Sequence, residues 1–296
     1  MGDKQATGNG AGEQAALWNG PSGQAWVAQQ ALLDQMFQPL EALLVGAVDA
    51  GAARHVLDVG CGAGATTLEL ARRIGARGQC TGIDISGPLV DAARSRAQRE
   101  GVPATFVQAD AQTHAFAPGG FDAIVSRLGV MFFTDPVAAF ANLRRAAKAG
   151  AVLRCIAWRS AADNPFMTTA ERAAAPLLPN LPPRQPGAPG QFAFGDRQRV
   201  QSILDESGWG DIDIEPVDVE CTLPAEALER YFTSLGPVGL ALQGVDAATR
   251  DAVIAAVRPA FAPYVQGETV SYTAACWMIS ASAPAMADRV GEDRHG

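Results

Sequence analysis

The stretch from Val56 to Gly64, Val-Leu-Asp-Val-Gly-Cys-Gly-Ala-Gly, constrains the fold more than any other part of this chain. Its apolar, β-branched residues predict a buried parallel strand, and its three alternating glycines predict a tight loop where that strand ends. Residues 66–74 then have the pattern of a helix. Because Gly60 and Gly62 carry no Cβ and tolerate positive φ, a ligand can approach the backbone there. The helix that follows directs free N–H groups toward such a ligand.

Further strands and helices alternate along the chain after this loop. The pattern predicts seven strands in all, with helices after the first, second and fourth and a Pro-Gly-Gly turn before the fourth, as in an open α/β sheet whose βαβ units are right-handed. The predicted strands cover residues 55–59, 79–84, 104–109, 121–126, 152–158, 211–221 and 268–279.

The length of 296 residues favours one α/β core with an added subdomain. Long helical and Pro-rich stretches lie outside the alternating pattern, and a loop as long as the Pro-rich one is typical of a lid. We therefore expect a disordered N-terminus (1–13), a helical arm (14–50) broken near Pro39, a core (51–160), a lid insertion (161–195), more core (196–222), a helical cap (223–264), a last core strand (265–281) and a disordered tail (282–296).

Composition excludes several classes of protein. The net charge of −8 argues against a nucleic-acid partner, which requires a concentrated basic surface. No apolar run is long enough to span a membrane, and no Cys or His cluster indicates a metal site. Five widely spaced cysteines in apolar contexts favour buried reduced thiols in a cytoplasmic protein.

Three aspartates lie in or directly after successive strands. Asp58 lies inside the first strand, where a buried carboxylate is costly unless another group satisfies it. Asp84 ends the second strand, where a carboxylate can accept both hydroxyls of a ribose. Asp110 follows the third strand and could accept from the exocyclic amine of a purine. Each could instead cap a loop, cap a helix or lie in a surface turn, but the carboxyl ends of parallel strands line one crevice.

These residues make the chain resemble the class I S-adenosylmethionine (SAM)-dependent methyltransferases, in particular the branch similar to the ubiquinone/menaquinone-biosynthesis methyltransferases. The matching blocks are residues 56–64, 82–86, 108–112 and 121–126. The resemblance implies a Rossmann-like seven-stranded, mostly parallel sheet with an antiparallel last strand and helices on both faces. It also implies SAM as cofactor, with S-adenosylhomocysteine as product, and an enzyme of class EC 2.1.1.

The resemblance assigns roles to individual residues. Asp58 and the loop of Gly60, Cys61, Gly62 and Gly64 would hold the methionine part of SAM. The remaining cofactor residues would be Asp84 at the ribose, Ile85 against the adenine, Asp110 and the Ala111 N–H at the adenine edge, and the Ser126 carbonyl at the methionine ammonium.

Two other functions fit parts of the same pattern. Residues 60–65 also match the glycine pattern of NAD(P)-dependent oxidoreductases, with Asp84 as the ribose-binding acid, but Asp58 and Asp110 then have no role. A SAM-binding protein without catalytic activity is the third alternative.

The acceptor is predicted to be a small, apolar or aromatic molecule, because alanine, leucine and proline dominate the expected lid and cap. The substrate-facing candidates are Arg127, Met131, Trp158 and Phe194, with Arg127 either paired to Asp122 or Asp135 or meeting an anionic acceptor. We expect no dedicated catalytic base and no metal, so that proximity and desolvation supply the rate. The exposed helical arm could pair between two subunits, which would give a homodimer.

Overall fold

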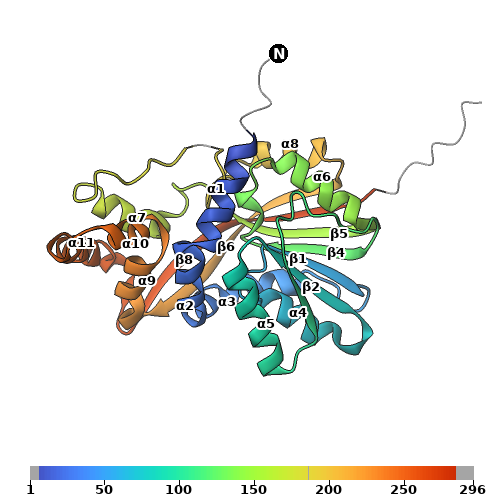
Figure 1. Cartoon of the computed structure of the whole chain (residues 1–296), viewed down its shortest axis with the longest axis horizontal. Helices are drawn as coiled ribbons and strands as arrows, with labels where there is room; N and C mark the ends of the chain where they lie inside the picture. The colour runs from blue at the N-terminus through green and yellow to red at the C-terminus, as the bar shows by residue number, and fades with distance from the viewer. Residues whose placement is uncertain (1–6, 186, 285–296) are drawn as a thin grey trace, which may run out of the picture.

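The computed structural model describes residues 7–185 and 187–284, which form a mixed sheet with helices on both faces (Figure 1). The strand order β3-β2-β1-β4-β5-β8-β6 places β1 between β2 and β4, all three parallel. β8 runs antiparallel to both β5 and β6, which confirms the predicted Rossmann-like architecture. The strands are β1 (His55–Val59), β2 (Gln79–Asp84), β3 (Ala104–Gln108), β4 (Phe121–Arg127), β5 (Ala147–Trp158), β6 (Gly210–Pro224), β7 (Val265–Gln266) and β8 (Thr269–Ser282).

The sheet has eight strands, so the prediction of seven was wrong by one. The additional strand, β7, has two residues and folds back on the start of β8 through Gly267, whose φ of 62° suits a tight turn. Two residues are too few to produce a recognisable alternation, and both are exposed.

Helices α3 (Gln30–Gly46), α4 (Ala65–Ile74) and α5 (Gly87–Glu100) cover one face of the sheet, and α6 (Pro136–Ala146) and α8 (Arg197–Glu206) cover the other (Figure 1). A side-chain oxygen caps several of them: Ser86 begins α5 and Asp135 begins α6, each accepting from a backbone N–H of the first turn. Gly101 ends α5 in the left-handed conformation, as its position predicts. Helices α7 (Pro165–Ala174), α9 (Leu228–Ser234), α10 (Gly236–Ala241) and α11 (Ala247–Ala260) group beside one end of the sheet.

The N-terminal arm consists of α1 (Thr7–Asn19), α2 (Pro21–Ala28) and α3. The prediction of disorder over residues 1–13 is wrong from Thr7 onward, because α1, which is anchored at its C-terminal end, begins at that residue. Residues 1–6 lie outside the described part of the chain. The expected break near Pro39 is also wrong. Pro39 lies inside α3, and the arm turns at Gly20 and Gln29 instead.

The tail was expected from residue 282, but β8 includes Ser282, and Ala283 still exchanges backbone hydrogen bonds with Gly150 and Ala151. Residues 285–296 lie outside the described part of the chain. Among the described helices, none has the length and apolar character that crossing a bilayer requires.

Candidate active site

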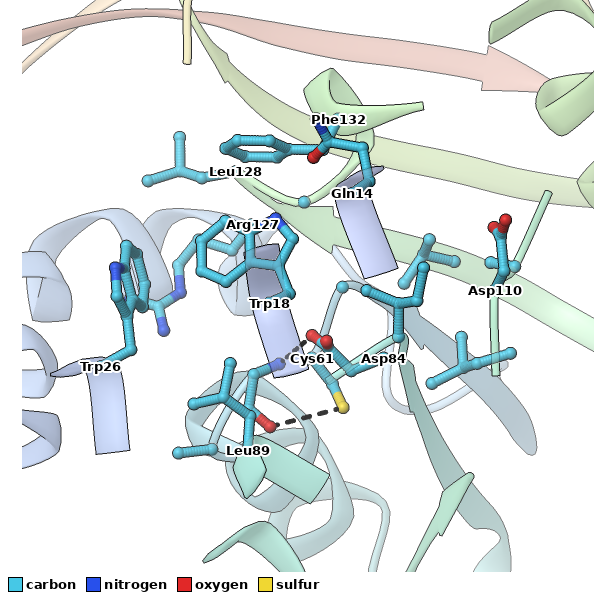
Figure 2. A pocket seen from close by; sticks show the side chains of 18 of the residues that line it. Gln14, Trp18, Trp26, Cys61, Asp84, Leu89, Asp110, Arg127, Leu128 and Phe132 are labelled. Carbon is cyan, nitrogen blue, oxygen red and sulfur yellow. Dashed lines mark hydrogen bonds between the residues drawn. The ribbon is translucent and has the colours of Figure 1, made fainter. Parts of the chain in front are cut away.

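A pocket lies where β1, β2, β3 and β4 end at the same edge of the sheet (Figure 2). The sheet order brings the loops after these four strands together, which is the usual ligand position in open α/β sheets. Of the predicted cofactor residues, those that line the pocket are Gly60, Cys61, Gly62, Asp84, Ile85, Asp110 and Ala111.

Asp84 is held against the glycine loop by its own carboxylate. Its Oδ2 accepts from the Gly62 N–H at 2.8 Å, and its Oδ1 accepts from the Ser86 N–H at 2.9 Å. Burial raises the pKa of Asp84, while these backbone donors oppose that rise. The direction in which a Gly62 Cβ would point is open space, so the loop exposes bare backbone beside a positioned acid.

The loop after β3 is fixed from both sides. The Asp110 Oδ1 accepts from the Gln112 N–H at 2.8 Å, and the Ala111 carbonyl accepts from the Asn142 amide at 2.9 Å. The Gln112 side-chain oxygen also accepts from the Asp135 N–H at 2.9 Å. The segment that would read a purine edge is therefore tied to α6.

Three predicted cofactor residues, Asp58, Gly64 and Ser126, support the loops from behind and do not line the pocket. Gly64 begins α4 with φ of 86°, and a Cβ there would meet the Phe106 ring at 3.0 Å. The Ser126 hydroxyl is buried, donates to the Val59 carbonyl at 2.7 Å and accepts from the Gly129 N–H at 3.2 Å. Its side chain joins the loops that follow β1 and β4.

The N-terminal arm forms the wall of the pocket that faces the strand ends. Trp18 makes edge-to-face contacts with Trp26, at a centroid distance of 5.5 Å, and with Phe132, at 5.2 Å. Figure 2 shows Asp84 and Asp110 toward one end of the pocket and Trp26, Arg127 and Leu128 toward the other. The arm residues in the lining are Gln14, Trp18, Trp26, Gln30, Leu33, Asp34 and Phe37.

The arm is fastened to the loop that follows Asp84. The Asn19 side chain accepts from the Gly87 N–H at 2.8 Å and donates to the Ile85 carbonyl at 3.0 Å. The Ser86 hydroxyl donates to the Trp18 carbonyl at 2.6 Å. Gly23 allows this approach, because a Cβ there would lie 2.0 Å from the Trp18 carbonyl oxygen.

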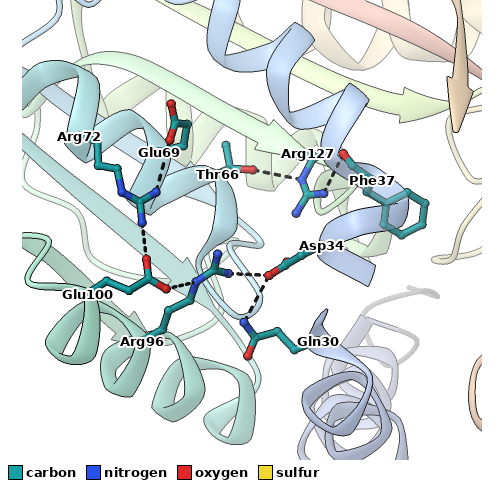
Figure 3. Close-up of polar contacts among 9 residues, drawn as sticks. All are labelled: Gln30, Asp34, Phe37, Thr66, Glu69, Arg72, Arg96, Glu100 and Arg127. Atoms are coloured by element: carbon teal, nitrogen blue, oxygen red, sulfur yellow. Dashed lines mark hydrogen bonds and ion pairs between the residues drawn. The ribbon is translucent and has the colours of Figure 1, made fainter. Parts of the chain in front are cut away.

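A second attachment joins α3 to α5 through charges (Figure 3). The Asp34 carboxylate accepts from Arg96 at 2.7 Å and from the Gln30 amide at 3.3 Å. Arg96 also pairs with Glu100 at 2.9 Å. Asp34 therefore lines the pocket with its charge already compensated.

Arg127 extends from the end of β4 into the pocket lining and is half-buried. Its Nε donates to the Thr66 hydroxyl at 3.1 Å and its Nη1 to the Phe37 carbonyl at 3.4 Å (Figure 3). The expected pairing with Asp122 or Asp135 is wrong. Asp122 binds Lys148 and two backbone N–H groups, and Asp135 caps α6, so both are engaged elsewhere.

The other three substrate candidates, Met131, Trp158 and Phe194, do not line this pocket. All are buried in the hydrophobic core, where the Met131 sulfur accepts from the Trp158 N–H at 3.4 Å and Phe194 stacks on Phe140 at 6.1 Å. Apolar residues at strand ends can point into the core as readily as toward a ligand, and the sequence does not distinguish the two directions.

Comparison with known proteins identifies one domain of the chain. Residues 56–150 match the family described as "Methyltransferase domain". Residues 56–150 of this chain are therefore a methyltransferase domain. An uncharacterised protein of Mycobacterium tuberculosis is 33% identical over 43% of this chain and 45% of its own length. Nocamycin O-methyltransferase of Saccharothrix syringae is 34% identical over 38% of this chain and 40% of its own length. The chain thus spans less than half the length of these two relatives.

The methyltransferase domain also has solved structural neighbours. The YcgJ protein of Bacillus subtilis superposes with a TM-score of 0.55 at 18% identity, covering 83% of this chain and 98% of that one. The likeness extends the shared fold well beyond residues 56–150.

The site fits SAM, the cofactor that the sequence resemblance implies. Asp58 is buried behind the glycine loop, where Thr67 donates to its Oδ2 at 2.6 Å and its Oδ1 has no hydrogen-bond partner. Burial raises the pKa of Asp58 to about 7. A buried, unsatisfied carboxylate oxygen favours a cationic neighbour, and SAM carries a sulfonium and an ammonium group.

The sequence left open whether Trp18 and Trp26 pack on the core or close over the ligand, and sequence reasoning did not identify the other arm residues that line the pocket. A signal was present, because Trp26, Gln30, Leu33 and Phe37 follow the spacing of one helical face. None of the described residues of 161–195 or 223–264, expected to be the lid and cap, lines this pocket.

Proposed function

We propose that this chain transfers the methyl group of SAM to a small, apolar or aromatic metabolite. The observation that supports this most is the division of one pocket into two chemically different ends. Asp84, Asp110 and the bare loop at Gly62 form one end, and tryptophans of the arm form the wall of the other. The partial match to an enzyme named nocamycin O-methyltransferase supports a small-molecule acceptor.

The proposed mechanism is in-line displacement aided by positioning. SAM supplies a methyl group on a positively charged sulfur, which is a good leaving group. Holding an acceptor in line with that group can contribute about 7–11 kcal/mol. The aromatic wall of Trp18, Trp26 and Phe132 would exclude water and orient the acceptor.

The lining supports catalysis without a dedicated base. Its carboxylates are Asp34, which pairs with Arg96, and the two acids assigned to the adenosine, Asp84 and Asp110. His114 instead contacts Phe116 at a centroid distance of 4.7 Å beside a second hollow.

The test is methyl transfer from isotopically labelled SAM to a panel of phenols, naphthols and their carboxylated analogues, with SAM binding measured separately by calorimetry. Labelled product with the wild-type chain and none with Asp84→Ala is the expected result. Binding of SAM without transfer to any acceptor would favour the SAM-binding protein without activity. Binding of NADH and not of SAM would instead favour the oxidoreductase.

A homodimer formed through the arm and a cytoplasmic location are also part of the proposal. The five cysteines are all buried and unpaired, which supports a reducing environment. Sedimentation of the purified chain with and without residues 1–20 would test the dimer.

A further inference from the structure

The acceptor end of the pocket contains a guanidinium whose charge is not paired. Arg127 is the cation among the described lining residues, and its two hydrogen bonds go to neutral oxygens, of Thr66 and Phe37. No ion pair of the described residues includes it. A guanidinium has five N–H donors in a planar fork, so most of its capacity is free.

The acids nearby do not replace an ion-pair partner. Glu41 and Asp58 act on Arg127 through their charge, but neither makes an ion pair or hydrogen bond with it. Burial raises the pKa of Glu41, and it raises the pKa of Asp58 to about 7, which reduces the negative charge that Asp58 presents at neutral pH. Asp34, the lining acid on the arm, is occupied by Arg96.

The surroundings of Arg127 are apolar and aromatic. Trp18, Trp26 and Leu128 lie at the same end of the pocket (Figure 2), and Leu33 and Phe37 of α3 also line it. A charged group in such a setting is costly unless a counter-ion reaches it, and the bidentate fork of arginine suits a carboxylate. Arg127 directly follows the buried Ser126 at the end of β4, next to Leu128 and Gly129, which also line the pocket.

We propose that Arg127 binds the carboxylate of an aromatic or other apolar acid, so that the methyl acceptor of this enzyme is anionic. The inference rests on the proposed methyl transfer and names its substrate class. The tryptophans of the arm would contact the apolar body of this acid, and the guanidinium would fix its orientation relative to the cofactor. A neutral analogue of the same shape would leave the guanidinium without a partner and bind more weakly.

The test uses the full chain saturated with S-adenosylhomocysteine and two probes of one shape, 2-naphthoate and 2-naphthamide. Binding is followed by calorimetry and by the intrinsic tryptophan fluorescence, to which Trp18 and Trp26 contribute. We expect the wild-type chain to bind the carboxylate about tenfold or more tightly than the amide. Arg127→Gln should abolish this preference, and Arg127→Lys, which keeps the charge but not the fork, should retain part of it.

Arg258→Gln is the matched control, because Arg258 is exposed on α11, pairs with Glu229 and does not line the pocket; it should keep the preference. Equal affinity for the two probes, no binding of either, or a preference that persists in Arg127→Gln would overturn the inference. A large loss of S-adenosylhomocysteine affinity in Arg127→Gln would also overturn it, because the guanidinium would then serve the cofactor. Failure of the wild-type chain to bind S-adenosylhomocysteine would instead overturn the proposed function itself.

Discussion

Gly60 and Gly129 contact each other backbone to backbone: a Cβ built on Gly60 would lie 2.6 Å from the Gly129 Cα atom. A Cβ on Gly129 would lie equally close, 2.6 Å, to the Val59 carbonyl oxygen. The first residue follows β1 and the second follows β4, so this contact sets the distance between the loops on the two sides of the pocket.

Gly129→Ala should therefore separate these two loops. Gly129 has φ of −94°, which alanine adopts freely, so the cost comes from the steric contact alone and not from backbone strain. We expect a loss of about 1–3 kcal/mol in the free energy of unfolding, measured in urea, together with weaker SAM binding. Gly46→Ala is the control, since a Cβ there meets no atom within 4 Å, and unchanged SAM affinity in both variants would contradict this role.

Asp84→Asn tests the acid that joins the glycine loop to the proposed ribose position. An amide keeps the size of the side chain but removes the charge, which weakens each charge-assisted hydrogen bond. We expect SAM to bind about 10- to 100-fold more weakly in calorimetry. Asp91→Asn on the exposed side of α5 removes the same charge away from the pocket and should leave the affinity unchanged. A variant of Asp84 with wild-type affinity would remove the acid from the site.

The order of the core elements was readable from the sequence because each element carried its own local signal. The strand before Gly60 and the terminator at Gly101 were predictable from residue type and spacing, and both lie where expected. The position of the three acids followed from the rule that parallel strands end at one edge.

The walls of the pocket depended on contacts between distant segments. Trp18 and Phe132 are far apart in the sequence, and nothing in either segment alone predicts that their rings meet. The sequence also does not show where the Met131 side chain points. Met131 is buried in the core, whereas its neighbour Phe132 lines the pocket. Long-range packing therefore decided which predicted residues face the ligand.

Asp58 should make the stability of the cofactor-free protein depend on pH. Its folded pKa of about 7 lies above the roughly 3.9 of an unfolded chain, so the folded state binds the extra proton between these values. The free energy of unfolding contributed by this group is then highest below pH ~4 and falls as the pH rises toward 7, by about 4 kcal/mol.

Asp58→Asn, which resembles the protonated acid, isolates this contribution from that of other carboxyls. The variant and the wild-type chain should have similar unfolding free energies at low pH, and the variant should be the more stable near pH 8. Urea unfolding of both proteins across this range is the measurement. A difference between them that does not change with pH would show that Asp58 is not protonated in the folded protein.

Asn19→Ala should loosen the arm over the pocket while leaving the core intact. The substitution removes the hydrogen bonds to Gly87 and Ile85 that fasten α1 to the loop after Asp84. Each is worth about 1 kcal/mol, so amide hydrogens of α2 should exchange several-fold faster, and SAM should dissociate faster. Asn180→Ala, at an exposed position that does not line the pocket, is the control. If exchange in α2 stays at the wild-type rate, the arm is held by the Asp34–Arg96 pair and by the packing of Trp18, and the Asn19 bonds do not control access to the site.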